Sequence, residues 1–287
     1  MLFDDAMALF LRSIRLKEFS GETQRAYARD LKLFNTFLSE EYNAAVYIDE
    51  ITVHDIEQYL HYLAVDKVLK ARSRNRYVST VSSMFNYALK KEWIEKNPAT
   101  FIDTARVTEQ KKVSLTEGEI AQLVEVIEKP ILRLAVLFMA KTGLRVNEVV
   151  MLKLSEVDLE TNIVHVIEGK GGKYREVPIA ESLRTELIEY LQQTREADSE
   201  YFFATKKTGR LSAQYINREL KMAAEALGWD KNITNHTLRR SFATILLNKN
   251  VNIVTIQHLL GHASLRTTSI YLNILDLDLR NAVDLLD

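Results

Sequence analysis

Apolar side chains recur at helical spacing in the first third of the chain. Between residues 20 and 42 they fall at Tyr27, Leu31, Phe34 and Leu38. Steps of three or four residues place apolar side chains on one face of a helix. The segment 20–42 is therefore predicted to be an amphipathic helix.

Two further helices are predicted before the chain reaches Pro98. Thr52 can cap one of them, with Asp55 in the first turn, where a carboxylate favours the positive end of the helix dipole. The other contains one apolar stripe, formed by Tyr77, Val81, Met84, Phe85, Ala88 and Leu89. Pro98 ends this pattern. The residues from about 20 to 98 thus form a run of helices, and we expect a four-helix domain.

The stretch between Pro98 and Leu115 is polar and lacks sustained periodicity, as is typical of a linker. Thr116 followed by Glu119 is the spacing of a capping box, which predicts the start of a new helix. We therefore expect a helical DNA-binding domain at residues 1–105, a linker at 106–114 and a second domain at 115–287.

The second domain mixes helical and β-type patterns. The runs NIVHVIE (162–168) and YREVPIA (174–180) are rich in β-branched residues and are joined by GKGGK, which predicts an antiparallel hairpin. Helical spacing resumes at SLRTELIEYLQQT (182–194) and continues from Ser212 onward. The predicted fold class is mainly α with a small antiparallel β-sheet (α+β).

Composition excludes several classes of protein. The 287 residues include no cysteine, which removes disulfides, thiolate nucleophiles and cysteine-based zinc sites. No apolar stretch reaches the roughly 20 residues that a membrane helix needs, so no membrane partner is expected. The N-terminus has acids where a signal peptide would carry positive charge, which favours a cytoplasmic protein.

The charge is unevenly distributed. The net charge of −1 does not by itself favour a nucleic-acid partner. The segment 67–91, however, carries seven basic residues and no acid, and local charge determines what a ligand experiences. The candidates for DNA contacts within this segment are Lys70, Arg72, Arg74 and Arg76. The alternative is an ordinary solvated helix face.

Two segments of the second domain each present a basic side chain near a glycine. In TGLRVNE, Gly143 interrupts an apolar helix just before Arg145, which could bind an anion or form a surface salt bridge with Glu148. In the GKGGK turn, Lys170 could deliver a proton or a positive charge to a phosphate, or belong to a solvated loop.

The segment HTLRRSFAT places His236 and Arg239 three residues apart on a predicted helix, where both can address one anion. The alternative is a helix start with Arg239 exposed to solvent. Further on, His258 and His262 are four residues apart, a spacing that invites a metal site. Gly261 is predicted to end the helix between them, and neither an HExxH motif nor a neighbouring carboxylate is present, so no metal is expected.

The last candidate is Tyr271, nine residues after His262 on the predicted helix TTSIYLNI. A single tyrosine on a helix is usually a core residue. Its sequence context changes this interpretation, because the order Arg, Lys, His-x-x-Arg, His and Tyr, with LLGH shortly before the tyrosine, strongly resembles the catalytic set of the tyrosine recombinases. That family comprises phage integrases and the bacterial Xer proteins. The resemblance covers residues 115–280 and, more loosely, the N-terminal pattern SGETQRAYARDLKLFNTFL.

The resemblance implies a role for each matching position. It implies Tyr271 as the nucleophile, Arg145 and Arg239 as phosphate clamps, and Lys170 as the acid for the leaving 5′ oxygen. It implies that His236 and His262 complete the pocket and that Glu148 supports the first arginine. We add two basic residues of the hairpin, Lys173 and Arg175, to the predicted DNA contacts. No cofactor is implied, because two guanidinium groups can offset the charge of the phosphate.

The function implied is site-specific DNA recombination through a 3′-phosphotyrosyl intermediate. The substrate is double-stranded DNA at a specific site, and the family arrangement is a tetramer on two DNA sites, with or without a partner recombinase. An apolar stripe after Tyr271 could dock on a neighbouring protomer or on its own domain; it comprises Leu275, Leu279, Val283 and Leu286. The expected location is the nucleoid in the cytoplasm of a bacterial or archaeal cell.

Two other functions fit part of the pattern. A type IB topoisomerase has a similar active site, but the separate N-terminal helical domain and the LLGH spacing favour a recombinase. A DNA-binding accessory protein with a decayed site is the non-enzymatic alternative, and the intact set of six candidate catalytic residues argues against it.

Overall fold

A computed structural model describes residues 1–107, 113–167, 174–195, 198–262, 264 and 267–268. The contacts within it divide the chain into two units, Met1–Gln110 and Lys111–Asp287. In the described part of the chain, no helix is both long enough and apolar enough to cross a membrane. The predicted class, mainly α with a small antiparallel sheet, is confirmed.

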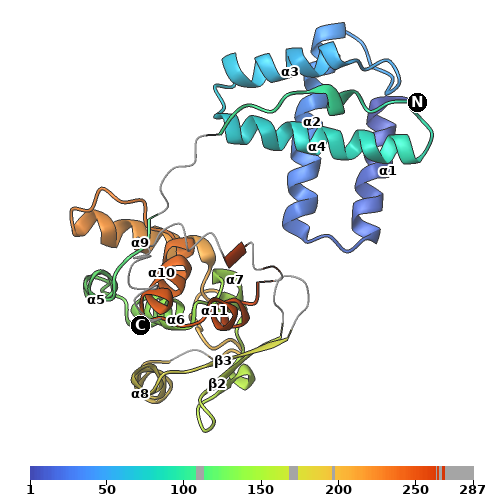
Figure 1. Cartoon of the computed structure of the whole chain (residues 1–287). Helices are drawn as coiled ribbons and strands as arrows, with labels where there is room; N and C mark the ends of the chain where they lie inside the picture. The colour runs from blue at the N-terminus through green and yellow to red at the C-terminus, as the bar shows by residue number, and fades with distance from the viewer. Residues whose placement is uncertain (108–112, 168–173, 196–197, 263, 265–266, 269–287) are drawn as a thin grey trace, which may run out of the picture. The chain divides into compact units, whose positions relative to one another are not determined.

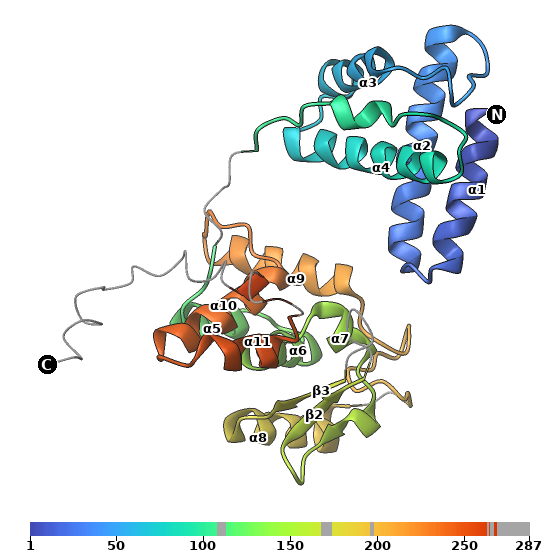
Figure 2. The ribbon, with the colours of Figure 1, turned by 45° about the vertical axis from the view of Figure 1, so that its right-hand side comes forward.

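Within its described residues, 1–107, the first unit is built from four α-helices and one 3-10 turn. They are α1 (Phe3–Leu16), α2 (Gly21–Tyr42), α3 (Val53–Val65), α4 (Ala71–Lys90) and η1 (Pro98–Phe101). Helices α1 and α2 lie side by side, and α4 runs across them (Figures 1 and 2). Helix α1 lies before residue 20, where the predicted run of helices begins, and was not predicted as a separate helix. Its buried residues Phe3, Ala6, Phe10 and Ile14 nevertheless have helical spacing.

The predicted helix starts are confirmed in the first unit. The Ser20 hydroxyl accepts a hydrogen bond from the backbone N–H of Thr23 and begins α2. Thr52 and Asp55 form a capping box at the start of α3, with the backbone N–H of Thr52 donating to Oδ2 of Asp55 over 2.7 Å. The predicted stripe of α4 was wrong at Leu89, which is 39% exposed.

A buried carboxylate links α2 to the basic segment. Asp30 is 1% exposed and accepts hydrogen bonds from the guanidinium of Arg76 and the hydroxyl of Thr80. A carboxylate withdrawn from water is costly unless charged donors surround it. Arg76 therefore has a structural partner within its own unit.

The second unit is organised around α6, whose buried side chains surround most of the helix. The α-helices in the described part of the second unit are α5 (Glu117–Glu125), α6 (Pro130–Thr142), α7 (Val146–Met151), α8 (Glu181–Glu189), α9 (Ala213–Ala226), α10 (Asn235–Asn248) and α11 (Ile253–Leu260). Helix α10 packs along α6, and the predicted capping box of Thr116 and Glu119 begins α5. A helix that is apolar on most sides is a core element, so α6 supports the segments on either side of it.

A three-stranded antiparallel sheet lies at one edge of this unit, with α8 beside it (Figures 1 and 2). The connected elements are η2 (Leu154–Glu156), β1 (Val157–Asp158), β2 (Ile163–Val166), β3 (Arg175–Pro178) and the π-helical turn η3 (Tyr190–Thr194). The predicted hairpin is β2 and β3, in which Val166 pairs with Arg175. Strand β1 was not predicted, because two residues are too few to show an alternating pattern.

Candidate active site

Arg145 is placed by a sharp turn between α6 and α7. Gly143, the residue after α6, has a φ of 66°, a left-handed conformation that favours glycine. A Cβ atom at this position would overlap with Cδ1 of Phe242. The turn therefore depends on glycine both for its conformation and for space, and it places Arg145 at the N-terminus of α7.

Glu148 lies behind Arg145 in the protein interior. Its side chain is 3% exposed, whereas that of Arg145 is 26% exposed. Nη1 of Arg145 donates to Oε1 of Glu148 over 2.9 Å, and the backbone N–H of Arg145 donates to Oε2 over 2.7 Å. The predicted pairing of these two residues thus exists, but the carboxylate is buried and the surface salt bridge considered as an alternative was wrong.

The Glu148 carboxyl remains ionised in spite of its burial. Burial alone raises its pKa, but hydrogen bonds from Arg175, from the backbone of Arg145 and from the Arg145 guanidinium outweigh this and lower the pKa below its ordinary value. One carboxylate therefore faces two guanidinium groups, and the three side chains together keep a net positive charge.

Arg239 is held inside the unit by main-chain oxygens. It lies in α10 and is 5% exposed, so the alternative of a solvent-exposed Arg239 was wrong. Its Nη1 donates to the carbonyl oxygen of Gly143 over 2.6 Å, and its Nη2 donates to that of Leu260 over 2.5 Å. These bonds fix the plane of the guanidinium group.

The C-terminal end of α11 carries the LLGH sequence. Gly261 has a φ of 63° and ends the helix, as predicted. The backbone N–H of Gly261 donates to the carbonyl of His258, and that of His262 donates to the carbonyl of Gln257. This pair of bonds is a Schellman motif. It leaves the carbonyls of residues 259, 260 and 261 available to other donors.

Three arginines occupy these three consecutive carbonyls. Arg175 donates to Leu259 over 3.1 Å and Arg239 to Leu260 over 2.5 Å, and Arg145 approaches the carbonyl of Gly261 at 3.5 Å. The partial negative charge at the end of a helix favours cations. Residues from α7, β3 and α10 are thereby brought to one place.

The positive charges of the arginines lower the pKa values of both candidate histidines. Burial and the charges of Arg239, Arg145 and Arg175 lower the pKa of His262 to about 4. Partial burial of the ring and the charges of Arg239, Arg240 and Arg145 lower the pKa of His236. Nδ1 of His262 lies 2.8 Å from the hydroxyl of Thr268. At neutral pH His262 is therefore an uncharged imidazole.

Arg175 departs from its predicted role in DNA contact. Its side chain is 10% exposed, and its guanidinium donates to Glu148 through Nη1 and Nη2 and to the carbonyl of Leu259 through Nε. The buried carboxylate requires these donors, so the guanidinium faces inward. The predicted residues Lys170, Lys173 and Tyr271 lie outside the described residues.

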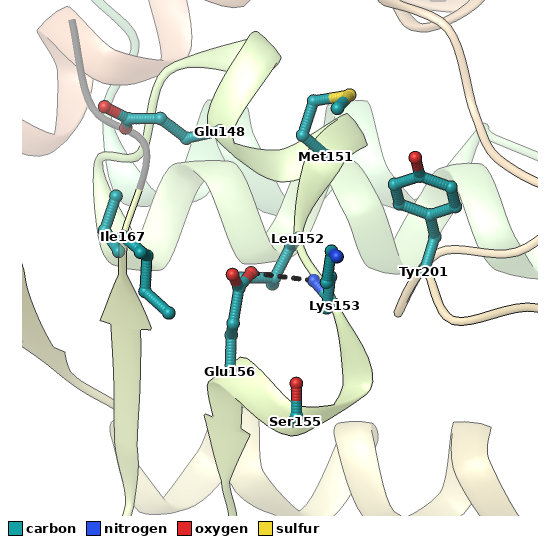
Figure 3. A pocket seen from close by; sticks show the side chains of 9 residues that line it. Glu148, Met151, Leu152, Lys153, Ser155, Glu156, Ile167 and Tyr201 are labelled. Carbon is teal, nitrogen blue, oxygen red and sulfur yellow. Dashed lines mark hydrogen bonds between the residues drawn. The ribbon is translucent and has the colours of Figure 1, made fainter. Parts of the chain in front are cut away.

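A cavity of about 420 Å³ adjoins the arginine cluster without containing it. Figure 3 shows Glu148 at one side of it and Lys153 and Tyr201 at the other. Among the residues that the structure describes, Glu148 is its only lining residue from the charged cluster, and no arginine lines it. The cavity is therefore separate from the place where the guanidinium groups meet.

The predicted DNA contacts of the first unit fall into two groups. Lys70 and Arg72 are exposed at the start of α4. Arg74 donates to the carbonyl oxygen of Leu69 over 2.8 Å, and Arg76 bonds to Asp30. The first two side chains are thus available to an anion, whereas the other two also bind within the unit.

Comparison with known proteins identifies similar chains for both units. Residues 113–277 match the model of the phage integrase family, and residues 7–92 match the N-terminal SAM-like domain of phage integrases. Tyrosine recombinase XerD of Staphylococcus saprophyticus is 32% identical in an alignment 285 positions long, which covers 94% of this chain and 94% of that protein. Tyrosine recombinase XerA of Pyrococcus furiosus is 34% identical in an alignment 285 positions long, which covers 96% of this chain and 94% of XerA.

Solved structures show the same fold. A crystal structure of XerA recombinase is 30% identical, with a TM-score of 0.54 and 97% of each chain covered. A lambda integrase dimer bound to a COC′ core site is 22% identical, with a TM-score of 0.79, and the match covers 94% of this chain and 95% of that one.

Proposed function

Because the chain belongs to the phage integrase family and is a tyrosine site-specific recombinase, we propose that Arg145 and Arg239 clamp the scissile phosphate and that Tyr271 attacks it. The observation that carries this assignment is the meeting of the two guanidinium groups on adjacent carbonyls, those of Gly261 and Leu260. Tyr271 follows this site ten residues after Gly261.

The reaction is a transesterification in two reversible steps. The phenol of Tyr271 gives its proton to a histidine of the pocket or to an oxygen of the clamped phosphate, and its oxygen bonds to phosphorus while the bond from phosphorus to the 5′ oxygen breaks. Lys170 gives the leaving 5′ oxygen its proton. The 3′-phosphotyrosyl linkage conserves the energy of the broken bond, so a 5′ hydroxyl of another strand can attack it and release the tyrosine. Rejoining therefore needs no nucleotide cofactor.

The site supports this chemistry electrostatically. Fixed donors aimed at developing charge are commonly a large catalytic contribution, with one donor worth about 3–4 kcal/mol. The net positive charge of Arg145, Glu148 and Arg175 complements an anionic phosphate. His262 and His236, whose pKa values are both lowered, can accept a proton or hydrogen-bond to a phosphate oxygen as neutral imidazoles.

Double-stranded DNA is the substrate, and the first unit supplies many of the contacts that bind it. Lys70 and Arg72 contact backbone phosphates, which position a protein on the duplex without specifying bases. We assign residues 1–105 to this DNA-binding domain, 106–114 to a linker and 115–287 to the catalytic domain. The active assembly is a tetramer on two DNA sites, with or without a partner recombinase. A related crystal structure, that of a lambda integrase tetramer bound to a Holliday junction, supports this part of the proposal.

The relatives come from bacteria and from Pyrococcus furiosus. This supports a nucleoid-associated protein in the cytoplasm of a bacterial or archaeal cell.

The test is covalent capture of DNA. The full-length protein is incubated with a library of nicked random-sequence duplexes, and adducts that survive denaturation are isolated, digested and analysed by mass spectrometry. We expect the nucleotide on the peptide containing Tyr271, no adduct with Tyr271→Phe, and an undiminished adduct with the control Tyr215→Phe in α9. Adduct formation by Tyr271→Phe at the wild-type level would contradict the assignment.

A further inference from the structure

We propose that Arg175 is a positioning residue of the cleavage site, which holds the Glu148 carboxylate in place so that Glu148 can fix the guanidinium of Arg145. The inference rests on the proposed role of Arg145 as a phosphate clamp. It replaces the predicted role of Arg175 in DNA contact.

The hydrogen bonds of the Glu148 carboxylate hold it in one orientation. Oε1 accepts from Nη1 of Arg145 at 2.9 Å and from Nη1 of Arg175 at 3.1 Å. Oε2 accepts from the backbone N–H of Arg145 and from Nη2 of Arg175, both at 2.7 Å. A carboxylate has about four lone-pair sites. All four are filled, two of them by Arg175, so the carboxylate cannot rotate without losing a charged hydrogen bond.

The three charged side chains differ in their exposure to solvent. The Glu148 side chain is 3% exposed, that of Arg175 is 10% exposed and that of Arg145 is 26% exposed. Arg175 thus satisfies the carboxylate from the inner side, and Arg145 extends from it toward solvent. Without Arg175, the buried Glu148 carboxylate would lose two of its four hydrogen bonds. The Arg145 guanidinium would then move inward to replace them, away from a phosphate.

Arg175 also holds the end of α11. Its Nε donates to the carbonyl of Leu259 over 3.1 Å. A Cβ atom on Gly261 would lie 2.9 Å from Cδ of Arg175, so the arginine stem lies directly against the backbone that precedes His262. Because Arg175 is the first residue of β3 and pairs with Val166, the last residue of β2, one side chain connects the end of the hairpin next to its turn, α7 and the turn of the LLGH sequence.

The experiment measures strand cleavage by the full-length protein. The substrate is a nicked duplex bearing the sequence that the wild-type protein selects from the random library. With Arg175→Met, we expect the cleavage rate at saturating DNA to fall about 10- to 100-fold, by analogy with the cost of removing a residue that orients a metal ligand. The Kd for the duplex should stay within about threefold, because the phosphate contacts that dominate affinity are elsewhere.

Two further variants separate positioning from general loss of structure. Arg175→Lys keeps the charge but not the bidentate geometry, so its cleavage rate at saturating DNA should also fall. This prediction can be tested even if Arg175→Met fails to fold.

The cleavage rate of Arg175→Met should fall at acidic pH, where that of the wild type does not, because Glu148 loses the donors that keep it ionised. The double variant Arg175→Met/Glu148→Gln should lack this fall at acidic pH and cleave no more slowly than Arg175→Met alone.

The outcomes are distinct. Wild-type cleavage by well-folded Arg175→Met, a loss confined to DNA affinity, or multiplicative effects in the double variant would each overturn the inference. Arg145→Ala and Tyr271→Phe serve as references. Cleavage by Tyr271→Phe would mean that the proposed function itself fails, whereas inactive Tyr271→Phe beside fully active Arg175→Met would reject only the role of Arg175.

Discussion

Nη1 of Arg239 lies 2.6 Å from the carbonyl oxygen of Gly143, 96 residues earlier in the chain. This bond joins α10 to the turn that positions Arg145. The two proposed phosphate clamps, Arg145 and Arg239, are thus part of one hydrogen-bonded structure. A substitution at Arg239 should therefore alter the position of Arg145, and a change in the turn should alter that of Arg239.

Arg239→Lys should cleave DNA about 100- to 1,000-fold more slowly at saturating substrate, the cost of losing one preorganised donor. A lysine has a single nitrogen and cannot bond two carbonyls while also gripping a phosphate. The matched control is the neighbouring Arg240→Lys, since Arg240 donates to the carbonyl of Val113. Equal losses in the two variants would show that the effect is not specific to the clamp.

Gly143→Ala should destabilise the protein by about 2–4 kcal/mol, the sum of a left-handed backbone penalty and overpacking against Phe242. Urea unfolding followed by circular dichroism measures this. Gly118→Ala is the control, because it lies in α5 with no atom within 4 Å of an added Cβ, and we expect it to be neutral or slightly stabilising. A neutral Gly143→Ala would contradict the described turn.

The second unit should lose stability as the pH falls from about 6.5 toward 4. The pKa of His262 is lowered to about 4 in the folded state, so the unfolded state binds its proton more readily and is favoured in acid. His236 acts in the same direction. His262→Gln should weaken this acid dependence, whereas His258→Gln, an exposed position, should not. Identical pH profiles of unfolding for wild type and His262→Gln would refute the assignment.

Arg76→Ala should lower the stability of the first unit by about 1–3 kcal/mol, because the buried Asp30 would lose one of its two charged partners and keep only the 3.4 Å contact with Arg29 and the bond from the Thr80 hydroxyl. Arg72→Ala should leave stability unchanged and reduce the salt dependence of DNA binding by about one phosphate contact. Thermal unfolding and binding titrations at several salt concentrations distinguish the two. Loss of stability in Arg72→Ala would place that side chain in the core instead.

Deleting the residues from Asp278 onward should leave DNA binding intact and impair assembly, since the deletion removes three of the four apolar residues proposed to dock on a neighbouring protomer. Sedimentation of protein–DNA complexes measures the stoichiometry directly. Unchanged tetramer formation by the truncated chain would exclude the tail from the interface.

The sequence by itself determined the local structure and the candidate chemistry. Capping boxes at Thr52 and Thr116 and the helix-ending Gly261 were predictable because their hydrogen bonds join residues a few positions apart. The spacing of His236 and Arg239 on one helix, and the order of the candidate residues that resembles the recombinase family, were also visible without coordinates.

Only the tertiary structure decided which charged side chains face solvent and which bind within the protein. Arg175 and Arg76 looked like DNA contacts, yet their partners are Glu148 and Leu259 for the first and Asp30 for the second. Those partners lie 27, 84 and 46 residues away in the chain. Packing brings such groups together, and periodicity carries no information about pairs at that separation.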